Sequence, residues 1–225
     1  MPPLSISAED GVVSICPEEL AANSRLLFSQ REHVSALVDD IEGLKLHPIV
    51  KARIADVARI TIETQEAGMR IIDKTGPLAN PADRDHCLQY MVAVPLLLGR
   101  LTAEDYEDEV ARDPRIDALR AKMVVSENAE FSRDYLDADK RAIGNAVQVW
   151  FADGTRTERV AIDYPIGHRR RRAEGIPQLV TKFERNLATL FDAKQRTTIA
   201  AACADQPRFE ALPVEDFMAL WVPRS

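Results

Sequence analysis

A short segment in the first half of the chain carries three side chains that can transfer protons. Its sequence is Asn80-Pro-Ala-Asp-Arg-Asp-His-Cys-Leu-Gln-Tyr90. Asn80 is a preferred N-cap residue and Pro81 suits the first helical position, so the sequence predicts a helix that begins here. On that helix Asp83, His86 and Tyr90 share one face. A carboxylate, an imidazole and a phenol together suit acid–base catalysis, but they equally suit a helix cap and two packing side chains.

A second segment, Gly167-His-Arg-Arg-Arg-Arg172, concentrates positive charge. Guanidinium groups bind carboxylates through paired hydrogen bonds, so the segment suits a small anion. It equally suits a surface for a protein partner or a solvated basic turn. Interleaved aromatic residues, which single-stranded nucleic acids stack on, are absent from it, and we do not expect nucleic-acid binding.

A third segment, Asp105-Tyr106-Glu107-Asp108, is acidic and is followed by Asp113. Paired carboxylates can bind a metal ion. Acidic residues are also expected in the first turn of a helix, where they face the positive end of the helix dipole. We favour the helical explanation and predict no metal site.

The composition predicts a globular protein of the cytoplasm. The chain has 225 residues, of which 46% are apolar and 29% charged, with a net charge of -7. It contains neither an apolar run of the roughly 20 residues that span a bilayer nor the pattern of a secretory signal. Cys16, Cys87 and Cys203 are too scattered for a disulfide framework or a zinc site, and they fit a reducing compartment.

The elements that must position these side chains form an α+β pattern, because strands and helices do not alternate regularly. Asp153-Gly154 predicts a hairpin between two of the strands. The predicted strands cover residues 57–64, 122–127, 142–151 and 156–163. The predicted helices cover residues 18–28, 32–46, 81–98, 102–109, 113–121, 176–191, 197–204 and 214–220.

Three strings of the chain resemble the C-terminal part of the MmgE/PrpD family. They are GPLANPADRDHCLQYMVAVPLLLGRLTAEDYED, DPRIDALRAKM and DYPIGHRRRRAEGIPQLVTKF, and the similarity runs from about Leu46 to near Val222. The resemblance implies an α+β lid domain over residues 46–175, with a small antiparallel sheet and helices. It implies that the helices of residues 176–225 pack on an all-α domain, and it leaves residues 1–45 outside the family.

The resemblance also implies a reaction. Members of the family act on small polycarboxylates, and the subgroup implied here removes water from 2-methylcitrate to give 2-methyl-cis-aconitate in propionate breakdown. It implies no iron–sulfur cluster, and we expect neither a metal nor another cofactor. Tyr90 matches an acid/base or substrate-donor residue, and His86 matches a residue that supports it. His168, Arg169 and Arg170 match groups that bind substrate carboxylates.

Two departures from the family shape our expectations about partners and activity. The helical N-terminal half is absent, and so is a Lys-x-Phe-Pro-Ala motif that supplies a lysine. We therefore expect a truncated or split enzyme that is inactive alone, with a small tricarboxylate as substrate. We expect a homodimer or association with a missing helical half, because the apolar stripe of the C-terminal helices would be exposed. The alternatives are a lid module that binds a tricarboxylate or a protein partner without turnover, or another lyase or isomerase of the family.

Overall fold

The computed structural model describes residues 7–9, 12–14 and 46–223. The chain divides into two compact units, Met1–Arg171 (unit 1) and Arg172–Ser225 (unit 2). The helices predicted over 18–28 and 32–46 lie outside the described residues, apart from residue 46. Strands β1 (Ser7–Glu9) and β2 (Val12–Ser14) pair antiparallel near the N-terminus.

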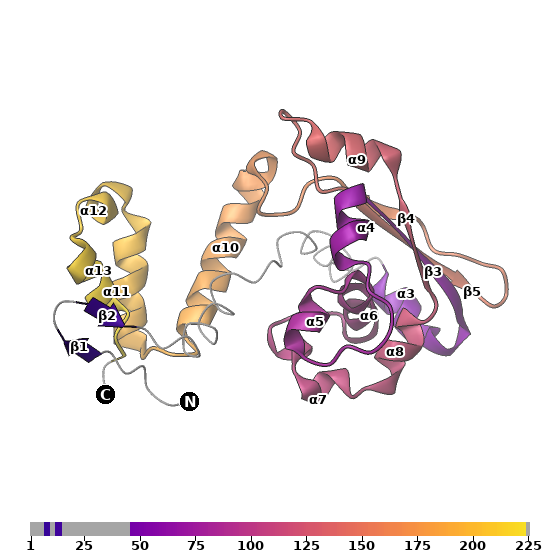
Figure 1. The fold of residues 1–225 in the computed structure, drawn as a ribbon, viewed down its shortest axis with the longest axis horizontal. Coiled ribbons are helices and arrows are strands. Elements are labelled where there is room, and N and C mark those ends of the chain that lie inside the picture. The colour runs from indigo at the N-terminus through magenta and orange to yellow at the C-terminus, as the bar shows by residue number, and fades with distance from the viewer. Residues whose placement is uncertain (1–6, 10–11, 15–45, 224–225) are drawn as a thin grey trace. The chain divides into compact units, whose positions relative to one another are not determined.

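A four-stranded sheet of order β4-β3-β5-β6 organises unit 1 (Figure 1). Its strands are β3 (Val57–Thr64), β4 (Met123–Glu127), β5 (Asn145–Phe151) and β6 (Val160–Ile162). The pairs β3–β5 and β5–β6 are antiparallel as expected, whereas β3–β4 is parallel, so the sheet is mixed. The predicted hairpin is confirmed, and Gly154 has the positive φ of 84° that its turn requires.

The last strand is shorter than predicted because a side chain replaces part of the ladder. The Thr157 hydroxyl accepts the Val149 amide hydrogen at 3.1 Å, while the Thr157 amide donates to the Val149 carbonyl at 2.9 Å. A side-chain acceptor in place of a backbone carbonyl interrupts regular strand pairing. Regular pairing therefore resumes only at Val160.

Helix α6 (Leu88–Leu98) is the centre of the core of unit 1. Ten of its eleven residues are buried, which is typical of a helix that is apolar on every side. It packs with α3 (His47–Ala52) and α8 (Pro114–Arg120) beside the strands, where the apolar face of β3 contributes Ile60 and Ile62 (Figure 1). Gly99, with φ 69°, ends the helix at the predicted position.

The remaining helices of unit 1 are short. They are α3 (His47–Ala52), η1 (Ile54–Asp56), α4 (Glu66–Ile72), α5 (Pro81–Asp85), η2 (Glu104–Tyr106), α7 (Asp108–Ala111), α8 (Pro114–Arg120), α9 (Ala129–Leu136) and η3 (Arg169–Arg171). The predicted helix over 102–109 is divided into η2 and α7, since Glu107 between them is extended with ψ 160°.

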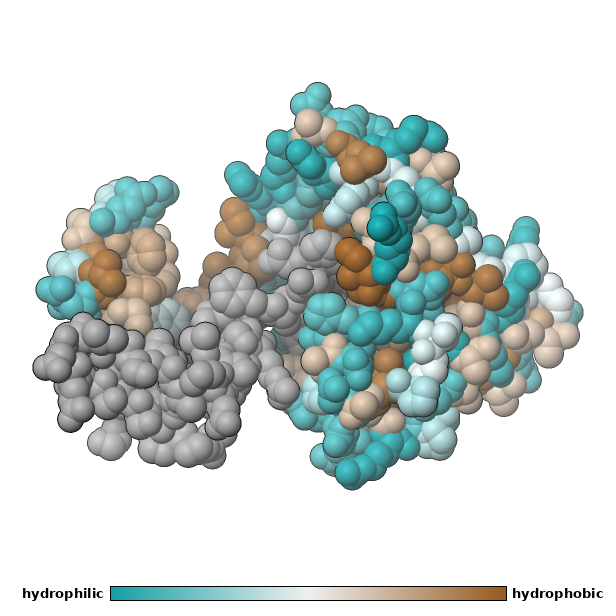
Figure 2. Space-filling model, viewed as in Figure 1, coloured by the Kyte–Doolittle hydropathy of each residue, from teal (hydrophilic) through white to brown (hydrophobic). Residues whose placement is uncertain are grey.

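Unit 2 is a small helical unit. Its helices are α10 (Arg172–Leu187), α11 (Ala193–Ala204), α12 (Gln206–Glu210) and α13 (Val214–Leu220). Leu187, Phe191 and Ile199 form its buried core. Other apolar residues within the helix predicted over 176–191 remain exposed, including Leu179 at 43% and Leu190 at 46%. The visible surface of unit 2 accordingly combines hydrophobic and hydrophilic areas (Figure 2).

Across the described ranges, every helix is too short or too polar to cross a membrane.

Candidate functional site

The predicted catalytic helix is divided at His86 and Cys87. Asn80 caps α5 as predicted, because its side chain accepts the Asp83 amide hydrogen at 3.0 Å. Asp83 in turn accepts the Ala79 amide hydrogen at 3.1 Å, which confirms its capping role. Cys87 is extended, with φ −121° and ψ 108°, and α6 starts only after it. Asp83, His86 and Tyr90 therefore do not share a helical face, and the prediction of one continuous helix over 81–98 is wrong.

Tyr90 lies in the core of unit 1 rather than on an accessible surface. Its side chain is 2% exposed, and its hydroxyl donates to the Asp105 carbonyl at 2.6 Å. The Tyr90 ring stacks on Tyr106 with 5.9 Å between centroids, and burial raises the pKa of Tyr90 to about 12. One edge of Tyr90 borders a hollow that Arg84 and Asp108 also line. His86 does not line this hollow. In unit 1, Tyr90 and His86 therefore line two different hollows.

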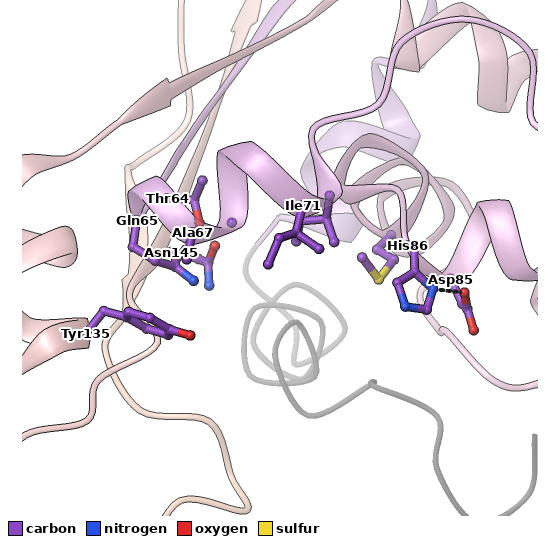
Figure 3. A pocket seen from close by; sticks show the side chains of 11 residues that line it. Thr64, Gln65, Ala67, Ile71, Asp85, His86, Tyr135 and Asn145 are labelled. Carbon is purple, nitrogen blue, oxygen red and sulfur yellow. Dashed lines mark hydrogen bonds and ion pairs between the residues drawn. The ribbon is translucent and has the colours of Figure 1, made fainter. Parts of the chain in front are cut away.

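His86 instead faces a separate pocket, here named the His86 pocket, with a cavity volume of about 60 Å³. In Figure 3, His86 and Asp85 lie across the pocket from Gln65, Asn145 and Tyr135, with Ile71 between the two sides. The lining residues come from the end of β3 and the residue after it, from α4, from the end of α5 and the residue after it, and from α6, α9 and β5: Thr64, Gln65, Ala67, Gly68, Ile71, Ile72, Asp85, His86, Met91, Tyr135 and Asn145.

The hydrogen bonds of His86 assign its tautomer. Its Nδ1 contacts the Asp85 carboxylate and lies 3.2 Å from the Ala82 carbonyl oxygen. Both partners are acceptors, so Nδ1 carries a hydrogen, and in the neutral imidazole Nε2 then keeps a lone pair. A neutral imidazole oriented by a carboxylate is a suitable general base, because the carboxylate stabilises the imidazolium that forms when Nε2 takes a proton.

The opposite side of the pocket is built from polar residues at the ends of two paired strands. Thr64 ends β3, and its register partner Asn145 begins β5. Both are buried, as is Gln65, whose side-chain oxygen accepts the Thr64 hydroxyl hydrogen at 2.6 Å. This bond leaves the Gln65 amino group as a donor towards the pocket. Among the described residues, the Tyr135 hydroxyl has no hydrogen-bond partner, so it is a second available donor.

Gln65, Tyr135 and Asn145 also line this pocket, although none of them belongs to a motif of the sequence. Polar residues directly after an apolar β-branched strand were the available signal for Gln65, since strand ends often carry binding residues. Asn145 and Tyr135 gave no comparable signal, because their approach to His86 depends on strand register and on the placement of α9.

His168, Arg169 and Arg170, here named the basic cluster, lie together at a second location in unit 1. Arg169 and Arg170 both donate to the Asp139 carbonyl oxygen, in the segment that directly follows α9. Arg170 also donates to the Tyr164 hydroxyl at 2.9 Å. Burial, together with Arg169 and Arg170, lowers the pKa of His168, so His168 is neutral near pH 7. The two arginines supply the positive charge of this cluster.

The acidic segment has structural roles. Asp105 is fully buried, pairs with Arg100 at 3.1 Å and accepts the Thr102 amide hydrogen at 2.7 Å. Asp113 caps α8. Across residues 7–9, 12–14 and 46–223, no group of three or more His, Cys, Asp or Glu side chains could hold a metal ion.

Comparisons with known proteins agree with the sequence resemblance. A profile of the MmgE/PrpD C-terminal domain matches residues 32–206. The chain is 60% identical over 167 residues to a 2-methylcitrate dehydratase of Cupriavidus necator, covering 74% of this chain and 34% of the relative. It is 59% identical over 168 residues to the enzyme of Salmonella typhimurium and 57% identical over 168 residues to that of Escherichia coli K12, covering 75% of this chain and 35% of each relative. The chain thus spans about a third of the length of these curated relatives.

Proposed function

The chain belongs to the MmgE/PrpD family, and from this membership we propose that it forms the C-terminal domain of a 2-methylcitrate dehydratase. The reaction would remove water from 2-methylcitrate and give 2-methyl-cis-aconitate. The observation that carries the proposal is the identity of 57–60% to three curated 2-methylcitrate dehydratases over about three quarters of the chain.

In this proposal His86 is the general base. Its Nε2 takes the proton from the carbon next to the one that carries the hydroxyl group. The electrons of the broken C–H bond form the carbon–carbon double bond, and the C–O bond breaks. The leaving hydroxide must gain a proton to become water, and the Tyr135 hydroxyl faces the pocket as a donor for it. Asp85 stabilises the imidazolium formed on His86.

We assign the substrate carboxylates to the basic cluster as part of the same proposal. Arg169 and Arg170 bind the segment that directly follows α9, and α9 carries Tyr135, so one element connects the cluster to the pocket. The lid domain expected over residues 46–175 would then end at Arg171, and the C-terminal helices expected from residue 176 would begin at Arg172 with α10. Association with a second copy, or with a counterpart of the unmatched part of the relatives, stays a prediction.

A second candidate function is binding of a tricarboxylate without turnover. Two observations count against turnover in the His86 pocket of this chain alone, so binding would depend on the arginines of the basic cluster. The His86 pocket has a cavity volume of about 60 Å³, whereas ligand pockets usually measure roughly 300–1,000 Å³. Its described lining includes neither lysine nor arginine, although a tricarboxylate needs cations close to its charges.

The test exchanges the matched segment of the E. coli enzyme for residues 46–223 of this chain. We expect the chimera to convert 2-methylcitrate, which the ultraviolet absorbance of the new conjugated double bond reports. His86→Gln in the chimera should lower kcat by about 10²–10⁴-fold, because the base is lost. His47→Gln is the matched control, since His47 lies outside the pocket and binds the Leu96 carbonyl through Nδ1.

The unmodified chain, titrated with 2-methylcitrate by calorimetry, separates the two candidates. Binding by the chain together with turnover by the chimera supports the proposed function. Binding by the chain with a folded but inactive chimera favours the second candidate. Unchanged kcat in the His86→Gln chimera would contradict the role of His86.

A further inference from the structure

Gln89 is a buried residue next to the His86 pocket. It contacts the segment that follows α4 on one side of the pocket and the segment that follows His86 on the other. It lies in the first turn of α6, is 4% exposed and does not line the pocket. Its amide nitrogen donates to the Asp73 carboxylate, and its amide oxygen accepts the Lys74 amide hydrogen at 3.3 Å. Asp73 and Lys74 directly follow Ile72, so Gln89 binds the end of the α4 side of the pocket.

The same amide oxygen of Gln89 also contacts the other side of the pocket. It lies 3.4 Å from the thiol of Cys87, which is fully buried and directly follows His86. The Cys87 thiol lies 3.4 Å from the Lys74 carbonyl oxygen as well. Cys87 is the extended residue that separates α5 from α6. Gln89 and Cys87 therefore hold the interruption of the helix against the segment that leaves α4.

We propose that Gln89 is a positioning residue that holds the Asp85–His86 pair towards the pocket by binding Asp73, Lys74 and Cys87. This inference rests on the proposed role of His86 as a base. An amide is suited to the task, because its oxygen accepts from Lys74 and Cys87 while its nitrogen donates to Asp73. An apolar side chain of similar size would preserve packing but make none of these bonds.

The first measurement is made without ligand and concerns only the positioning. Imidazole ¹⁵N spectra of the full chain distinguish a single Nδ1–H tautomer from a mixture, and His86→Gln assigns the His86 signals among the four histidines. We expect one tautomer in the unmodified chain and a mixture in Gln89→Met, because the bond to Asp85 loosens. Asp73→Ala should give the same change, and since Asp73 is exposed this variant remains folded.

Thr157→Val is the matched control, because it removes buried hydrogen bonds of unit 1 near the Val149 end of the sheet. It should leave the His86 signals unchanged. The proposal is overturned if Gln89→Met and Asp73→Ala, both folded, keep the spectrum of the unmodified chain. It is equally overturned if Thr157→Val changes the His86 signals as much as they do.

A second measurement tests the proposed function separately from the positioning role of Gln89. Addition of 2-methylcitrate should shift the His86 signals of the unmodified chain, and Gln89→Met should weaken this binding by roughly tenfold, the effect of losing about 1.4 kcal/mol. If the unmodified chain shows no response to 2-methylcitrate, the proposed function fails at this pocket. The ligand-free spectra then still decide whether Gln89 positions His86.

Discussion

His86 and Tyr90 are neighbours in sequence, but their surroundings give them opposite properties. The His86 side chain is 34% exposed and contacts a carboxylate, whereas the Tyr90 side chain is buried against Tyr106 and donates to a backbone carbonyl. A partly exposed imidazole with a free Nε2 can exchange protons with a ligand. A buried phenol whose hydrogen is already bound stabilises the fold instead.

The pKa of Tyr90 makes this structural role measurable. Burial raises that pKa from 10.0 to about 12, so in the alkaline range the unfolded chain loses the proton before the folded chain does. The contribution of the neutral Tyr90 phenol to the free energy of unfolding should be fully present below about pH 10, and roughly 2 kcal/mol of it should be lost as the pH rises through about 12. Tyr90→Phe should lose this part of the pH dependence.

The measurement for Tyr90 is denaturant unfolding between about pH 9 and about pH 12, followed by Trp150 fluorescence in a Trp221→Phe background. Tyr164→Phe is the control for loss of a phenol and should keep the steeper pH dependence of the unmodified chain. Equal pH dependence of Tyr90→Phe and the unmodified chain would contradict the stabilising role of the neutral phenol.

At the scale of elements, local sequence signals predict where helices begin and where turns occur. Tertiary contacts determine where helices are interrupted. Asn80 and Gly154 adopt the expected cap and turn because those conformations depend on the residue itself. The break at Cys87 depends on Lys74 and Gln89, and no local signal marks it. Helix α9 is difficult to predict because it has only eight residues and its position also depends on Asn128, which donates its amide hydrogen to Thr64 of β3.

The cap of α9 should help to hold Tyr135 in the His86 pocket, because this helix carries Tyr135. The Asn128 side chain accepts the Glu130 amide hydrogen at 3.0 Å and donates to the Glu63 carboxylate at 2.7 Å. Asn128→Ala should cost about 1 kcal/mol, the usual effect of losing a cap. We expect faster amide hydrogen exchange in α9 and weaker binding of 2-methylcitrate.

Asp205→Ala is the matched control for Asn128→Ala, since Asp205 caps α12 in unit 2 through the Arg208 amide hydrogen. It should speed exchange in α12 and leave both α9 and binding unchanged. Unchanged exchange in α9 of Asn128→Ala would show that the contacts of the helix with the sheet, rather than its cap, hold Tyr135 in place.

At the scale of the whole molecule, the chain is acidic and the two units have cores of different size. The chain carries a net charge of -7, which repels an anionic ligand at long range, so local cations such as Arg169 and Arg170 must offset it. The core of unit 1 extends from the sheet through α6, whereas that of unit 2 consists of Leu187, Phe191 and Ile199. The two units should therefore differ in their tolerance of a core substitution.

Ile199→Ala tests this difference. Ile199 is fully buried, and truncation of such a side chain costs about 2–5 kcal/mol. A unit of roughly 50 residues has a total stability of only about 3–8 kcal/mol, so the variant should lose amide protection throughout α10, α11 and α13. Protection in β3 and α6 should persist, as hydrogen exchange with mass spectrometry would report. Val214→Ala is the control, because its side chain is 77% exposed, and it should change amide protection in neither unit. Loss of protection in α6 of Ile199→Ala would contradict the prediction and show that both units unfold as one.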